Sequence, residues 1–152
     1  MDNKEFKKFF SEMGKIYGFK PAYGIFYIES TECLFVLELQ KSNFSNLYYL
    51  NMKIFIQGYF GRTYSKDKET LKKHYGSVYT RLPDIYLYIF DLESDIPDTK
   101  RVEKMDNLFK EFIVPFSKKA LFLRGIKELI NENKLDLIPT ELEELERLML
   151  IK

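Results

Sequence analysis

Hydrophobic and polar side chains alternate along residues 21–57, and this alternation predicts a three-stranded antiparallel ribbon. From Cys33 to Gln40, odd-numbered residues share one face and even-numbered residues share the other. A turn over residues 43–46 then sets this strand against the next, with the pairs Leu34–Phe55, Val36–Lys53, Glu38–Asn51 and Gln40–Tyr49. The same register sets Leu39 against Leu50 and Leu37 against Met52, so one face is apolar and becomes the core.

A tight turn at residues 30–31 brings an earlier strand, which begins at Pro21, alongside the ribbon. Its alternation places Phe26 and Ile28 on the core side, and Tyr23, Ile25 and Tyr27 on the opposite side. Tyr23, Glu38 and Asn51 are then expected to form one row across the sheet. Residues 84–92 alternate in the same way, which predicts a fourth strand whose tyrosines join the face opposite the core.

Helical periodicity flanks the predicted sheet on both sides. Before it, apolar residues from Phe6 to Tyr17 recur at helical spacing up to Gly18, a residue typical of helix ends. After it, we expect helices from Pro97 to Pro115 and over residues 117–133. Thr140 and Glu143 form a capping-box pattern that opens a final helix. Residues 57–77 are a long connection that is expected to contain a short charged helix at about residues 66–75.

These elements predict one α+β domain over residues 1–152: an N-terminal helix, an antiparallel sheet of about four strands, and C-terminal helices packed on the sheet. The 24 basic and 23 acidic residues leave a net charge of +1, so no general attraction to nucleic acid or to anionic membranes is expected. The longest apolar run, residues 85–90, is too short to cross a bilayer. With no secretory signal pattern and one cysteine, the sequence favours a cytoplasmic location.

No residue pattern of catalysis or metal binding stands out. His74, the only histidine, falls in a lysine-rich stretch with no orienting partner, and we interpret it as a solvated loop residue. Cys33 falls on the predicted core face, and one His with one Cys does not make a zinc site. The glycines at 58 and 61 lack the context of a phosphate loop. We therefore expect no catalytic residue, no metal and no cofactor.

The face opposite the core carries the candidate binding residues, because polar and tyrosine side chains share it: Tyr23, Glu38, Gln40, Tyr49, Asn51 and Lys53. The first hypothesis is a non-enzymatic protein-interaction module, immunity-like or regulatory, since tyrosine-rich surfaces with few charges suit protein partners. A second is a small-molecule-binding or hydrolytic enzyme with a pocket between the sheet and the C-terminal helices, using Glu38 as base. A third is weak single-stranded nucleic-acid binding, against which the central Glu38 argues. C-terminal helices are expected to cover part of this face, and the pattern leaves the oligomeric state open.

Three short motifs add a resemblance. Gly18-Phe19-Lys20, then Leu39-Gln40-Lys41-Ser42, then Tyr49-Leu50-Asn51 resemble a family of small bacterial proteins known as a domain of unknown function, over roughly the first 60 residues. Where the family has a small residue two positions after the Asn, this chain has Lys53. The resemblance implies a bacterial cytoplasmic context and supports the strands, and it implies no activity.

Overall fold

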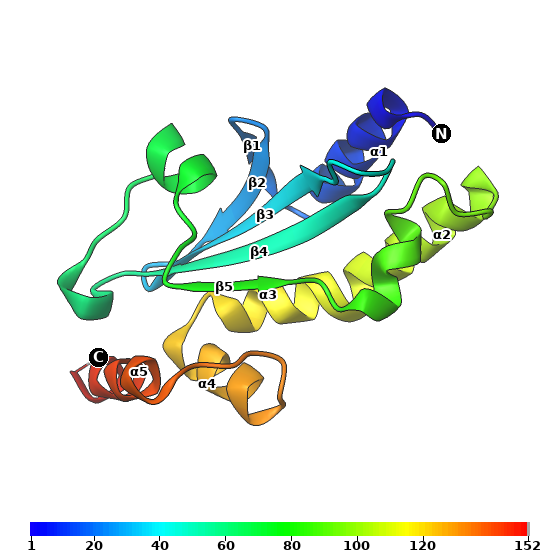
Figure 1. Ribbon diagram of the computed structural model, residues 1–152. Coiled ribbons are helices and arrows are strands. Elements are labelled where there is room, and N and C mark those ends of the chain that lie inside the picture. The colour runs from blue at the N-terminus through cyan, green and yellow to red at the C-terminus, as the bar shows by residue number, and fades with distance from the viewer. Residues whose placement is uncertain (152) are drawn as a thin grey trace.

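The computed structural model describes residues 1–151 and contains one sheet with helices before and after it (Figure 1). The elements follow in the order α1 (Asn3–Ile16), β1 (Lys20–Ala22), β2 (Ile25–Glu29), β3 (Cys33–Lys41), β4 (Tyr48–Ile56), η1 (Tyr59–Gly61), η2 (Glu69–Lys73), β5 (Val78–Arg81), η3 (Asp84–Ile89), α2 (Asp98–Leu108), η4 (Phe109–Ile113), α3 (Val114–Ala120), α4 (Leu123–Asn131) and α5 (Pro139–Ile151). The predicted α+β class is confirmed.

The sheet has five antiparallel strands in the order β1-β2-β3-β4-β5. The predicted register of β3 and β4 is confirmed, including Glu38 opposite Asn51 and Gln40 opposite Tyr49. The predicted strand over residues 84–92 is wrong for residues 84–89, which form η3 after the chain leaves β5. Only its end returns to the sheet, where Asp91 bridges Leu47 beside the start of β4. Proline has no amide to donate to a strand pair, and the buried Arg101 side chain binds the carbonyl of Ile89 at 2.6 Å, which stabilises the tight turns of η3.

The strand that is predicted to begin at Pro21 forms two strands, β1 and β2. Tyr23 and Gly24 adopt left-handed backbone angles (φ 54° and 83°) and form a tight turn, so β1 folds back on β2. Pairing of β2 with β3 ends at Phe26 and Leu37, so Glu38 has no partner in this hairpin. The expected row of Tyr23, Glu38 and Asn51 is wrong, because Tyr23 lies at the tip of this hairpin.

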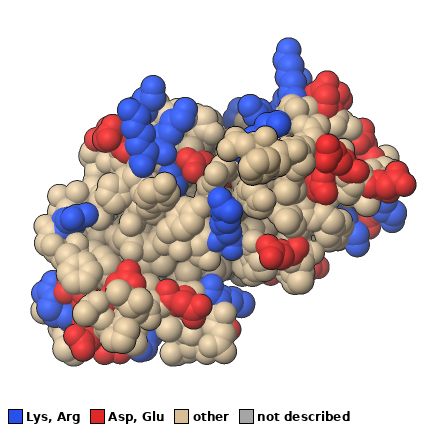
Figure 2. Space-filling view, viewed as in Figure 1, with Lys and Arg blue, Asp and Glu red and all other residues tan. Residues whose placement is uncertain are grey.

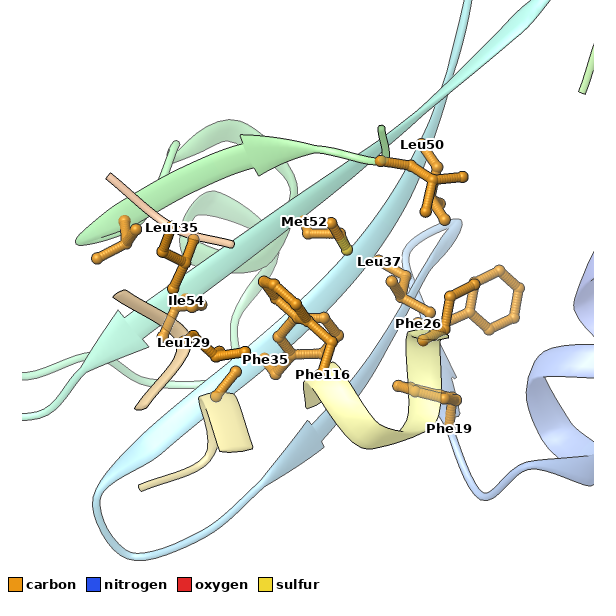
Figure 3. Close-up of a cluster of buried hydrophobic side chains, with 14 of the residues drawn as sticks. Phe19, Phe26, Phe35, Leu37, Leu50, Met52, Ile54, Phe116, Leu129 and Leu135 are labelled. Atoms are coloured by element: carbon orange, nitrogen blue, oxygen red, sulfur yellow. The ribbon is translucent and has the colours of Figure 1, made fainter. Parts of the chain in front are cut away.

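The main core lies between one face of the sheet and the helices, as predicted. Odd-numbered residues of β3 and even-numbered residues of β4 meet aromatic and aliphatic side chains from α1, α3 and α4. Figure 3 shows part of this core, with Phe35 of β3 beside Phe116 of α3. Phe35 and Phe116 pack with ring centroids 6.0 Å apart, which joins β3 to α3. Cys33 is fully buried on this face, as its position in the alternation predicts.

The helices after the sheet differ from the prediction at three places. The helix that starts after Pro97 does not end at Pro115, because the wider π turn of η4 just before it accommodates the proline and α3 follows directly. The chain then breaks at Phe122, which is extended (φ −135°, ψ 144°), before α4. The predicted capping box is wrong: α5 begins at Pro139, and Glu141, not Glu143, accepts a hydrogen bond from the Ile138 amide at 3.1 Å.

The opposite face of the sheet is covered by the connection between β4 and β5 rather than by a C-terminal helix, which corrects the expectation from the sequence. Leu71 of η2 is fully buried there against a small second cluster of Ile25, Leu34, Val36 and Phe55. Figure 1 shows this green segment and the yellow helix α3 on opposite sides of the strands. The cover ends before Gln40 and Tyr49, and the far end of this face stays accessible.

Candidate functional site

A hydrogen-bonded network of polar side chains occupies the accessible end of this face, with Asn51 at its centre. The Asn51 amide nitrogen donates to Glu38 Oε1 at 3.1 Å and to Gln40 Oε1 at 2.9 Å. Its amide oxygen accepts from the Tyr79 hydroxyl at 2.8 Å and from Arg81 Nε at 2.9 Å. Asn51 is 2% exposed and its full hydrogen-bonding capacity is used, so the network fixes the geometry of the side chains around it.

Lys53 connects the network to the covering segment. Its ammonium group lies 3.2 Å from Glu38 Oε2 and donates to the carbonyl of Lys72 at 3.1 Å. The residue is 2% exposed, and a buried ammonium is stable only when paired in this way. Lys53 therefore holds η2 on the sheet and has no free charge to offer a ligand.

Arg81 forms the outer part of the network and lies at the surface. Its guanidinium group stacks on the ring of Tyr49, 4.4 Å from the centroid, and Nη2 donates to Gln40 at 2.9 Å. Within residues 1–151, no carboxylate forms an ion pair with Arg81, although acceptors on two neighbouring side chains fix its orientation. A guanidinium held in this way is preorganised to bind a planar anion such as a carboxylate.

The structure brings together five of the six residues expected from the sequence: Glu38, Gln40, Tyr49, Asn51 and Lys53. Tyr23 does not join them, and its side chain is 49% exposed at the hairpin tip. Sequence reasoning missed Tyr79 and Arg81. The alternation of Val78 and Thr80 with Tyr79 and Arg81 could have shown this strand, but it is only four residues long and sits at the end of a long connection.

His74 lies at the edge of the covering segment and is half-buried, not solvated as the sequence suggested. Its ring packs against Phe55 and Tyr64, and Nδ1 accepts the amide hydrogen of Gly76 at 2.9 Å. One ring nitrogen is thus engaged in the turn before β5. Among the described residues, no group of His, Cys, Asp and Glu side chains is arranged to hold a metal ion, and no helix is long and apolar enough to span a membrane.

A second polar cluster, at the opposite end of the molecule, connects α5 to η1. Glu144 pairs with Arg147 Nε at 2.7 Å and accepts the Phe60 amide hydrogen at 2.6 Å. The Arg147 guanidinium, together with the Phe60 amide, lowers the pKa of Glu144 to about 2. Burial raises the pKa of the neighbouring Tyr59, whose hydroxyl donates to the carbonyl of Glu141. Glu144 and Tyr59 thus connect α5 to η1, and this cluster explains packing rather than binding.

Comparison with known families gives one match. A family model described as a domain of unknown function, DUF4304, matches residues 10–119, a range that includes the whole sheet and every residue of the Asn51 network. Comparisons with curated proteins and with solved structures give no significant match. Because the matched range is well over half of the chain, this protein belongs to the DUF4304 family of domains of unknown function.

Proposed function

We propose that the domain binds a protein partner without catalysing a reaction, in an immunity-like or regulatory role in the bacterial cytoplasm. The contact surface is made by Arg81, Tyr49, Gln40 and Tyr79, which we call the Arg81 surface. The observation that carries the proposal is the fixed guanidinium group of Arg81, stacked on Tyr49 and without an ion-pair partner within residues 1–151. A carboxylate of the partner is the expected ligand of this group.

The composition of the Arg81 surface supports this proposal. Arginine and tyrosine are the residues that most often dominate the energy of protein interfaces, because they offer large contact areas with polar ends. Tyr79 is 38% exposed and Arg81 is exposed, while the buried Asn51 holds both in place. Little conformational entropy is then lost when a partner binds.

The geometry around Glu38 favours binding over hydrolysis. One carboxylate oxygen accepts from Asn51 and the other pairs with Lys53, so neither is directed at a substrate. The geometry also argues against binding of single-stranded nucleic acid. That hypothesis requires Lys53 and Lys41 to line one exposed groove, and Lys53 is buried in its ion pair.

The test compares Arg81→Ala with Arg124→Ala, a matched control at an exposed arginine of α4. Proteins captured from extracts of the source cells by the wild-type domain are identified, and the partner is then purified and titrated by calorimetry. We expect Arg81→Ala to lower the affinity for this partner by about 30-fold or more, which corresponds to the loss of a hot spot of about 2 kcal/mol. Equal affinity of the wild type and Arg81→Ala for the purified partner refutes the proposal.

A further inference from the structure

β3 is longer than the strand beside it, and this difference opens a notch in the sheet. Pairing with β2 ends at Phe26 and Leu37, because the chain turns away at Gly24, whereas β3 continues to Lys41. The notch has a volume of about 430 Å³ and lies between this free end of β3, helix α1 and η2. It is lined by Lys7, Ser11, Gly24, Ile25, Phe26, Glu38, Leu39 and Lys72.

The backbone of β3 offers hydrogen-bonding groups to the notch. In an antiparallel strand, successive residues direct their N–H and C=O groups to opposite sides. The Ser42 amide donates toward β4, to the Leu47 carbonyl at 2.8 Å, so the groups of Leu39 and Lys41 are directed away from β4. Within residues 1–151, the β1–β2 hairpin supplies no hydrogen bond to Leu39. An edge of this kind accepts an added strand.

The charged side chains at the notch indicate which chemical group an added strand should bring. Lys7 comes from α1 and Lys72 from η2, and neither forms an ion pair among the described residues, whereas Lys66 and Lys73 nearby are paired with Glu29 and Glu69. Both oxygens of Glu38 are already bonded to Asn51 and Lys53. Figure 2 shows Lys and Arg side chains gathered over η2 at the upper left, with a further group over α1. Two of the residues that line the notch are therefore lysines without an ion pair among the described residues, and their side chains are available for an anion.

We propose that the notch binds the C-terminus of an extended peptide, which adds to the free edge of β3 in line with β2. A peptide that runs antiparallel to β3 ends at Gly24 and Ile25, the residues that close the notch, and brings its terminal carboxylate toward Lys7 and Lys72. The free edge of β3 is about 10 Å long, so it pairs with about three residues of the peptide. Leu39 and Phe26 line the core-side wall and accommodate an apolar side chain.

The probe is a pool of acetylated pentapeptides with randomised last three residues, prepared once with free C-termini and once as C-terminal amides. Peptides that the domain retains are identified by mass spectrometry and titrated by fluorescence anisotropy. We expect free carboxylates to bind at least about 10-fold more tightly than the matching amides. On binding, the amide signals of Leu39 and Lys41 in NMR spectra should shift and become protected from hydrogen exchange.

Two double variants locate the anion. Lys7→Ala/Lys72→Ala should lower the affinity for the peptide by about 10-fold or more. Lys8→Ala/Lys68→Ala removes the same charge from the same segments and should leave the affinity unchanged. The proposal is overturned if amides bind as well as carboxylates, if no peptide binds below about 1 mM, or if the two double variants behave alike. Equal binding of 4-methylpentanoate, or binding of inorganic phosphate alone, also overturns it, because neither pairs with a strand edge.

This proposal does not rest on the Arg81 surface, and the variants separate the two. Arg81→Ala should bind the peptide with the affinity of the wild type, since Arg81 does not line the notch. Loss of peptide binding in Arg81→Ala would move the peptide to the Arg81 surface and refute the notch as its site. Failure of the notch variants leaves the partner titration with Arg81→Ala unaffected.

Discussion

Replacing Lys53 with Met tests the buried connection between the sheet and its covering segment. Methionine keeps an unbranched apolar stem but removes the ammonium group from a side chain that is only 3% exposed. The substitution therefore abolishes the ion pair with Glu38 at 3.2 Å and the hydrogen bond to the Lys72 carbonyl at 3.1 Å. The interaction with the Leu71 carbonyl, at 3.5 Å, is too long to contribute much.

The expected cost follows from how much of Glu38 remains in contact with water. Removing one partner of a fully buried ion pair costs about 3–5 kcal/mol. The Glu38 side chain is 22% exposed and keeps its hydrogen bond from Asn51, which reduces the penalty of leaving it unpaired. We therefore expect the free energy of unfolding to fall by about 2–3 kcal/mol. For a domain of this size, such a change lowers Tm by roughly 4–12 °C.

Urea unfolding followed by circular dichroism measures this change against a matched control. Lys41→Met removes an exposed lysine of the same sheet that has no ion pair within residues 1–151, and it should cost less than about 0.5 kcal/mol. Adding Glu38→Gln to Lys53→Met should restore about 1 kcal/mol, because the unpaired charge is removed. A cost for Lys53→Met as small as that of Lys41→Met would refute the reasoning.

Four further substitutions test the stability of the helices, of the first hairpin and of the ion pair on α5. Gly125→Ala places a Cβ 2.0 Å from the Lys119 carbonyl oxygen and should cost more than about 3 kcal/mol in urea unfolding. In Gly14→Ala the added Cβ meets only ordinary contacts, so this variant should be more stable than the wild type by about 0.5–1 kcal/mol. If both glycine variants were destabilised, or both stabilised, the reasoning would be contradicted. Tyr23→Asn should raise the free energy of unfolding by about 0.5–1 kcal/mol, because asparagine tolerates the left-handed backbone of this turn. A urea midpoint below that of the wild type would contradict this prediction. The lowered pKa of Glu144 contributes stability that is present above pH ~4.5 and is lost as pH falls toward about 2. Replacing Glu144 with Gln removes this contribution, so the free energy of unfolding of the variant should fall less steeply as the solution is acidified.

The central hairpin could be predicted from the sequence because its information is local. Alternation sets the two faces of β3 and β4, and a one-residue slip would expose the whole core face, so one register satisfies both strands. That register alone brings Glu38 beside Asn51 and Gln40 beside Tyr49. The core positions of Cys33, Phe35 and Met52 follow from the same alternation.

Short elements were misplaced because their patterns are ambiguous. Residues 84–89 alternate as a strand would, yet the alternation of so few residues also fits a tight helical turn, and Pro83 with Arg101 decides for the turn. The turn at Tyr23 and Gly24 has a tyrosine where asparagine is usual, so the sequence did not signal a hairpin there. Pro115 suggested a helix end, and a π turn accommodated it.

The sequence by itself determined the α+β class, the core face and most of the polar network, because these depend on the period of side chains along neighbouring strands. Only the tertiary structure decided what surrounds that network. Leu71 covers one end of the face, Arg81 completes the other, and the early turn at Gly24 opens the notch beside Leu39. Each of these involves segments far apart in the chain, and their positions are set by packing rather than by local pattern.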